Sequence, residues 1–144
     1  MVGNREYGRA MKHILVGFDG SPNARRALEE ALDLAKSDTR ITVVAVAQAP
    51  PAPGQALPAG AEGLEERRQE LEDARRLLAE LGRNAELAAV SGAPADVLVE
   101  EAAQRGADLI VVGRRGLSGA ERLVMGSVSA KIARTARCSV LIVR

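Results

Sequence analysis

Residues 107–129 are the most informative stretch of the sequence about the fold. They read Ala-Asp-Leu-Ile-Val-Val-Gly-Arg-Arg-Gly-Leu-Ser-Gly-Ala-Glu-Arg-Leu-Val-Met-Gly-Ser-Val-Ser. Leu109 to Val112 form an unbroken aliphatic run, which predicts a strand buried on both faces, as parallel strands inside α/β proteins are. The run stops at Gly113, and apolar residues at helical spacing follow from Val128 to Ala136. The sequence therefore predicts a strand, a glycine-rich turn and a helix, and the turn is the candidate active surface.

This turn has the composition of an anion-binding loop. Gly113 and Gly116 flank Arg114 and Arg115, and Gly126 precedes the helix. Glycine permits close approach of the backbone, and loop amides followed by the unpaired amides of a helix start form a concavity that suits a phosphate chain. The arginines add charge and forked donors. A short glycine pattern is equally compatible with a structural turn and solvated arginines, so both interpretations stay open on these residues alone.

Strand and helix patterns alternate along the rest of the chain. Valine-rich runs predict strands, and apolar residues at helical spacing predict helices. We expect strands at 13–18, 41–47, 84–90, 109–112 and 140–143, and helices at 22–36, 64–81, 95–105 and 128–136. Such alternation without an internal repeat predicts an α/β protein with a five-stranded parallel sheet and helices on both faces.

Two helices carry further detail. Ser21 is expected to cap the first helix and Pro22 to occupy its first position. The apolar stripe of this helix is Ala24, Ala27, Leu28, Ala31, Leu34 and Ala35. The helix at 64–81 has an apolar face and many Glu and Arg residues, which we interpret as solvated intrahelical pairs; the apolar face is Leu64, Leu71, Ala74, Leu78 and Leu81. Residues 48–63 hold four prolines and three glycines, which predicts a loop without regular structure, and its length suggests a function.

The composition limits the class of protein. The chain has 144 residues, 47% of them hydrophobic, which is the length of a single domain and enough apolar residues to form its core. We expect a flexible extension at 1–11 and a single domain at 12–144. A net charge of +1 and only two aromatic residues, Tyr7 and Phe18, argue against nucleic acid as a partner. Without an apolar run of membrane-spanning length or a signal peptide, and with Cys138 as the single cysteine, we expect a cytoplasmic protein that does not enter a membrane.

Several motifs together resemble a known family. The spacing of Gly113, Gly116 and Gly126-Ser127 is similar to the nucleotide-binding signature of the universal stress proteins. Residues 14–21, Ile-Leu-Val-Gly-Phe-Asp-Gly-Ser, resemble that family's first strand and turn, and residues 92–94, Gly-Ala-Pro, its loop before the third helix. The resemblance covers roughly residues 12–144. One departure is Ser139, where the family often has proline, and it concerns the entry to the last strand.

The resemblance implies a Rossmann-like fold of the adenine nucleotide alpha hydrolase type with strand order 3-2-1-4-5. In such a sheet, ligands bind outside the carboxyl ends of the strands where the order reverses. That position brings Asp19, after the first strand, beside Gly113. The Asp19 carboxylate could bond a ribose hydroxyl or hold Mg²⁺ through water, or it could only bond the turn amides of Gly20 and Ser21.

By the same resemblance, the ligand is ATP, bound with magnesium. The backbone near Val46 would contact adenine, Val112 would line the base pocket, and the glycines with Ser127 would hold the phosphates. Arg115 lies where many family members have a basic residue, and the sequence does not separate its role from that of Arg114. The expected nucleotide-binding residues are Gly17, Asp19, Val46, Val112, Gly113, Arg115, Gly116, Gly126, Ser127 and Val128.

Other chemistries lack their residues. His13 begins the first expected strand and Cys138 precedes the last, so both should lie at the amino ends of the strands, away from the site. Because His13 is the only histidine and is expected away from the site, a Ser-His-Asp triad fails on geometry. No His/Cys cluster has metal-ligand spacing. The chain has no G-x-x-x-x-G-K-[ST] motif and no lysine near the expected phosphates. A dedicated phosphotransferase would need such a lysine to contact the phosphates.

Three functions remain as hypotheses. The first is an ATP-binding universal stress protein that acts as a nucleotide-responsive regulatory module. The second is a slow ATPase or autophosphorylating enzyme on the same site, with Ser118, Ser127 or Ser129 as phosphate acceptor. The third is a nucleotide-free dimeric interaction protein. We also expect a homodimer through Val140–Val143, because the resemblance places this aliphatic strand at an open sheet edge.

Overall fold

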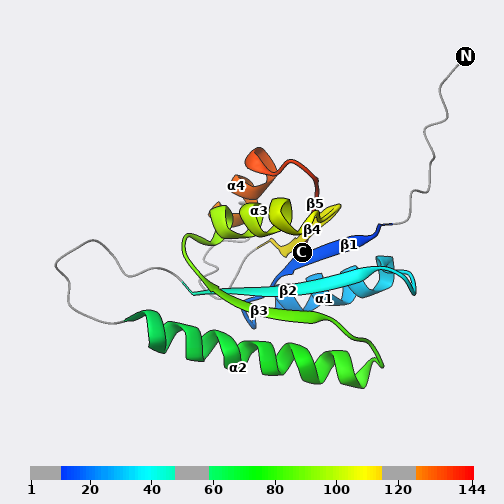
Figure 1. Cartoon of the computed structure of the whole chain (residues 1–144), viewed down its shortest axis with the longest axis horizontal. Coiled ribbons are helices and arrows are strands. Elements are labelled where there is room, and N and C mark those ends of the chain that lie inside the picture. Colours follow the sequence, from blue (N-terminus) through cyan, green and yellow to red (C-terminus); the bar gives the residue numbers. More distant parts are fainter. Residues whose placement is uncertain (1–10, 48–58, 115–125) are drawn as a thin grey trace, which may run out of the picture.

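The computed structural model describes residues 11–47, 59–114 and 126–144, and for 59–64 only the main chain. Strands and helices alternate throughout this part of the chain (Figure 1). The strands are β1 His13–Gly17, β2 Arg40–Ala47, β3 Glu86–Ser91, β4 Leu109–Gly113 and β5 Ser139–Val143. The helices are α1 Pro22–Leu34, α2 Ala59–Glu80, α3 Pro94–Arg105 and α4 Ser127–Thr135.

The sheet has the order β3-β2-β1-β4-β5, and every neighbouring pair is parallel. The predicted five-stranded parallel sheet of order 3-2-1-4-5 is therefore confirmed. β1 is central, with Gly17 opposite Val44 of β2 and Ile14 opposite Leu109 of β4. β3 and β5 form the two edges.

Two apolar cores cover the two faces of the sheet. α1 and α2 pack on one face and α3 and α4 on the other (Figure 1). Successive side chains of a strand point to opposite faces, so β1 contributes Ile14 and Val16 to the first core and Leu15 to the second. This arrangement explains why β1 and β4 read as continuous apolar runs, because both of their faces are buried.

The start of α1 follows the prediction, but its apolar stripe differs at the end. Ser21 Oγ accepts a hydrogen bond of 3.1 Å from Ala24 N, and Pro22 opens the helix. Near the end of the helix, Leu32 is buried and Leu34 is 47% exposed. The predicted burial of Leu34 is wrong because the helix ends at this residue, and its last turn presents Leu32 to the sheet.

Two other boundaries differ from the prediction. α2 begins at Ala59, so residues 59–63 are helical and not part of a loop; Gly60 and Gly63 weaken a helix but do not break it when many further turns continue it. Leu71, Ala74 and Leu78 are buried as expected, whereas Leu81 follows the helix end and is 50% exposed. Met11 packs against the first core, so the last residue of the predicted extension belongs to the folded part.

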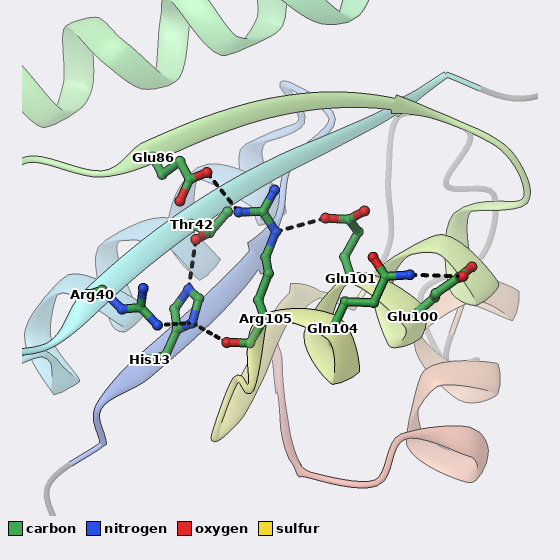
Figure 2. A network of polar contacts seen from close by, with 8 residues as sticks. All are labelled: His13, Arg40, Thr42, Glu86, Glu100, Glu101, Gln104 and Arg105. Atoms are coloured by element: carbon green, nitrogen blue, oxygen red, sulfur yellow. Dashed lines mark hydrogen bonds and ion pairs between the residues drawn. The ribbon is translucent and has the colours of Figure 1, made fainter.

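His13 lies at the amino end of β1, away from the carboxyl ends of the strands. It is 3% exposed and sits in the polar network of Figure 2. Its Nε2 is 2.7 Å from Thr42 Oγ1, and the Arg105 carbonyl accepts a bond of 3.2 Å from its Nδ1. The ring thus joins β1, β2 and the end of α3, which is a structural role.

Candidate functional site

The topological switch point of a parallel sheet is the place where the chain leaves two neighbouring strands toward opposite faces of the sheet. β1 and β4 pair side by side, up to Val16 opposite Val111. After β1 the chain continues to α1 on one face, whereas α4, the next helix after β4, lies on the other (Figure 1). Open parallel sheets bind ligands outside the carboxyl ends at such a point. The described part of the predicted site lies here.

Asp19 forms the turn that leaves β1. Its Oδ1 accepts a hydrogen bond of 2.9 Å from Ser21 N. This bond is the structural role that the sequence left as an alternative for Asp19, and it holds the carboxylate at the carboxyl end of β1. Because a carboxylate has two oxygens and about four acceptor positions, the bond leaves capacity for a ligand hydroxyl.

Gly113 ends β4 where α1 approaches most closely. A Cβ added at Gly113 would lie 2.8 Å from the carbonyl carbon and 2.8 Å from the Cβ of Asn23. The glycine therefore has a packing reason that is independent of any ligand. At Gly17, an added Cβ would instead meet the ends of two side chains, 2.9 Å from Leu98 Cδ1 and 3.0 Å from Val112 Cγ1.

The chain after Gly113 is tied to the start of α4. Arg114 N donates to Val143 O at 2.6 Å, and Gly126 N donates to Arg114 O at 3.0 Å. The buried Ser129 hydroxyl lies 3.1 Å from the Arg114 carbonyl and 3.0 Å from the Gly126 carbonyl. Arg114 and Gly126, far apart in the sequence, are thus held together beside the end of β4.

The start of α4 has no side-chain cap. Gly126 is the residue before the helix, with φ −59° and ψ 151°, which any residue can adopt, so its contribution here is the absence of a side chain. The first N–H groups of a helix have no partner within the helix. Ser127 and Val128, the first two residues of α4, are exposed. Amides at the positive end of a helix are groups to which anions bind in proteins.

Val46 lies on β2 beyond the end of β1. The pairing of β1 with β2 ends with Gly17 opposite Val44 and a bond of 2.9 Å from Phe18 N to Val44 O. Successive residues of a strand turn their main-chain polar groups to alternate sides, so Val46 turns its N–H and C=O to the same side as Val44. These groups face the open end of β1. Val112, in contrast, is 5% exposed and belongs to the second core.

Arg115, Gly116 and Ser118 lie outside the described residues. Arg114 is described and half-buried, with its main chain bonded on both sides. Among the possible phosphate acceptors, Ser129 is 2% exposed and its hydroxyl is engaged with two carbonyls. That burial argues against Ser129 as a phosphate acceptor, whereas Ser127 is exposed at the helix start.

Glu70 of α2 is a residue of this region that the sequence analysis missed. It packs over the turn after β1, where an added Cβ at Gly20 would lie 3.4 Å from Glu70 Cγ. The pKa of Glu70 is raised to about 7, mainly by burial; Arg67 opposes the rise, and the nearby Asp19 carboxylate adds to it. The predicted solvated pairs of α2 are present, but the Arg67–Glu70 pair at 2.9 Å is only partly exposed. A signal was available, since Glu70 lies one helical turn, four residues, before the buried Ala74.

The described residues form neither a metal-binding cluster nor a membrane-spanning helix. Within 11–47, 59–114 and 126–144, no three His, Cys, Asp or Glu residues are grouped as they would be to hold a metal ion. None of the helices in that part of the chain is both long and apolar enough to cross a membrane. Cys138 is half-buried just before β5, and burial raises the pKa of its thiol.

The fold and the switch point define a class of protein, the doubly wound parallel α/β proteins that place ligands between the first and fourth strands. Comparison with known proteins identifies the family. Residues 11–144 match the model of the universal stress protein family. The chain therefore belongs to the universal stress protein family.

Individual relatives agree with this assignment. The universal stress protein YxiE of Bacillus subtilis is 34% identical, with 91% of this chain and 97% of that protein covered. A universal stress protein solved in complex with cAMP is 32% identical, with 94% and 98% covered and a TM-score of 0.72. The Arabidopsis thaliana family protein At3g01520 with AMP bound is 24% identical, with 92% and 90% covered and a TM-score of 0.67, so this likeness shows the fold alone.

Proposed function

We propose that this protein binds an adenine nucleotide, ATP carried with magnesium, at the switch point between β1 and β4. The observation that supports the proposal best is the uncapped start of α4, held beside Gly113 by the bond between Gly126 N and Arg114 O. The amides of Ser127 and Val128 suit a phosphate group by hydrogen bonding and by the helix dipole. A relative solved with cAMP supports the same class of ligand.

The residues predicted for the site include a group suited to each part of such a ligand. The main chain of Val46 offers a donor and an acceptor for the edge of an adenine base, and the Asp19 carboxylate offers an acceptor for a ribose hydroxyl. Gly113, Gly116, Gly126 and Ser127 would hold the phosphates, Gly17 and Val112 would flank the base, and Arg115 would add positive charge. When bound, magnesium would neutralise phosphate charge.

We infer a regulatory output and little turnover. Lys131, on α4, forms an ion pair of 2.9 Å with Asp96 of α3 and does not lie free for a phosphate. The buried hydroxyl of Ser129 is unsuited to accept a phosphoryl group. A protein that holds ATP without rapid hydrolysis can report nucleotide level through its conformation or partners. We propose that it does so in the cytoplasm as part of a stress response.

The first test is whether ATP co-purifies with the protein, measured on small molecules released by denaturation. The decisive variant is Gly126→Val, because a branched side chain before α4 would block the approach of a phosphate to the helix amides. Calorimetric titration should show no ATP binding by the variant and an unchanged fold by circular dichroism. Thr135→Val introduces the same side chain at the other end of α4 and should bind as the parent does. Equal binding by Gly126→Val would refute the phosphate assignment.

A further inference from the structure

The carboxyl of Glu70 is arranged to hold a proton. One of its oxygens, Oε1, lies 2.9 Å from Arg67 Nη1, whereas Oε2 is buried and has no hydrogen-bond partner among the described residues. The side chain is 16% exposed. A buried carboxylate oxygen without a partner is unfavourable, and a proton on Oε2 removes the charge that makes it so.

The charges around Glu70 add to this preference. Facing it are Arg67, Glu66 and Asp73 of its own helix and Asp19 from the turn after β1. One cation therefore stands against three carboxylates. Burial together with this surplus of negative charge raises the pKa of Glu70 to about 7, in spite of Arg67. The ordinary pKa of 4.5 would leave the group fully ionised in a neutral solution.

The position of Glu70 connects this proton to the proposed ligand. Glu70 packs against the Asp19-Gly20-Ser21 turn, where an added Cβ at Gly20 would be 3.4 Å from its Cγ and 3.8 Å from its Cδ. The same turn carries the carboxylate proposed to contact the ribose. Arg67 and Glu70 also line a shallow polar hollow on α2, which opens to solvent, so protons can exchange without unfolding.

We propose that the protonation state of Glu70 regulates nucleotide affinity at the switch point, with the neutral carboxyl favouring binding and the ionised carboxylate weakening it. This inference rests on the proposed function. Ionisation of Glu70 places a second negative charge beside Asp19, and that charge repels the phosphates of a nucleotide without metal. Nucleotide and proton binding are therefore coupled, and by linkage a bound nucleotide makes Glu70 hold its proton more tightly.

The test is calorimetric titration of ATP without divalent metal at about pH 6 and about pH 8, on either side of the Glu70 transition. The parent, Glu70→Gln and Glu72→Gln are compared. Gln keeps the shape of the neutral carboxyl, and Glu72→Gln removes the same charge from a side chain that is 57% exposed on the same helix. ATP has its own proton equilibrium near pH 6, which affects all three proteins equally and cancels in the comparison.

We expect the affinity of the parent and of Glu72→Gln to fall about fivefold more between the two pH values than that of Glu70→Gln. Near pH 7, titration in two buffers with different ionisation heats should show that the parent takes up more protons on binding than Glu70→Gln does. Identical pH dependence in all three proteins would overturn this inference and leave the proposed function standing. Absence of metal-free ATP binding by every protein at both pH values would overturn this inference. Absence of binding with magnesium as well would also overturn the proposed function.

Discussion

Gly113 has no room for a side chain, because the main chain of Asn23 in α1 lies 2.8 Å from the position of its missing Cβ. A backbone neighbour cannot rotate away, so a methyl group there must displace α1 or β4. At Gly17 the nearest atoms are the ends of Leu98 and Val112, which can adjust. The two glycines thus differ in how much their absent side chains matter to the fold.

We therefore predict that Gly113→Ala lowers the free energy of unfolding by about 1–3 kcal/mol, as overpacking does. Gly17→Ala should lower it by less, although both variants add one methyl group. Urea unfolding followed by circular dichroism measures both. A Gly113→Ala variant as stable as the parent would show that this close approach is not a constraint on the fold.

Glu70 gives a second prediction at the residue scale. Its pKa is about 7 in the folded protein, against an ordinary 4.5, so between these values the folded chain holds a proton that the unfolded chain has lost. The stabilising contribution of this proton is complete below pH 4.5, is lost as the pH rises through about 7, and amounts to at most about 3 kcal/mol. The Glu70→Gln variant has no carboxyl to ionise at this position, so this loss of stability does not occur in it.

The free energy of unfolding of the parent should therefore fall relative to that of Glu70→Gln as the pH rises through this window, as measured by urea titration at several pH values. Glu72→Gln serves as the charge-matched control and should follow the parent. Parallel pH profiles for the parent and Glu70→Gln would contradict the prediction.

At the scale of elements, two serines of α4 have separate tasks. Ser129 is buried and reaches back to the carbonyls of Arg114 and Gly126, so it holds the helix to the end of β4. Ser127 is exposed at the first position of the helix, where the proposed phosphates bind. We therefore expect Ser129 to contribute to stability and Ser127 to contribute to binding of the proposed ligand.

We predict that Ser129→Ala lowers the free energy of unfolding by about 1–2 kcal/mol, as expected for a lost buried hydrogen bond. Ser127→Ala should leave the stability within about 0.5 kcal/mol of the parent and weaken ATP binding. Thermal unfolding and calorimetric titration of the same two samples measure both effects. The assignment would be wrong if Ser127→Ala were the destabilised variant and Ser129→Ala the one with an unchanged melting temperature.

At the scale of the whole molecule, the two sheet edges are the places where a second chain could pair with this one. β5 is an edge strand with half-buried aliphatic side chains from Val140 to Val143, and none of the described strands lies on its outer side. β3, the other edge, is also half-buried, and α2 packs across it. Unpaired edges invite pairing with a second chain, and two-fold pairing of β5 would close the assembly.

We propose a homodimer through β5 and predict that light scattering at micromolar concentration gives twice the mass of one chain. Leu141→Lys should give a single-chain mass, because the added charge would lie in the interface. Leu87→Lys makes the same change on β3 and should leave the dimer intact; both leucines pack partly against the first core, so losses of stability should be similar. A single-chain mass for the parent rules the dimer out, and an intact Leu141→Lys dimer places the interface elsewhere.

Local sequence was enough to predict the alternation of strands and helices, the two-sided burial of β4 and the Ser21 cap of α1, because these features depend on residues within a few positions of one another. The parallel sheet followed from that alternation, and the strand order from the family resemblance. The ends of the helices were predicted less accurately. Leu34 and Leu81 were predicted to be buried but are exposed, because burial at these positions depends on where the last turn of the helix ends.

The residues that surround the site are known only from the tertiary structure. It placed Asn23 against Gly113, Glu70 over the Asp19 turn, and the start of α4 beside Arg114. These contacts join segments that are distant in sequence, and they depend on how each helix rolls and slides on the sheet. Periodicity shows which face of a helix is buried, but it does not show which residue at the margin of that face meets which strand end. The raised pKa of Glu70 depends in part on such a meeting, with the Asp19 turn, and a local pattern shows only that the residue lies near the buried face of α2.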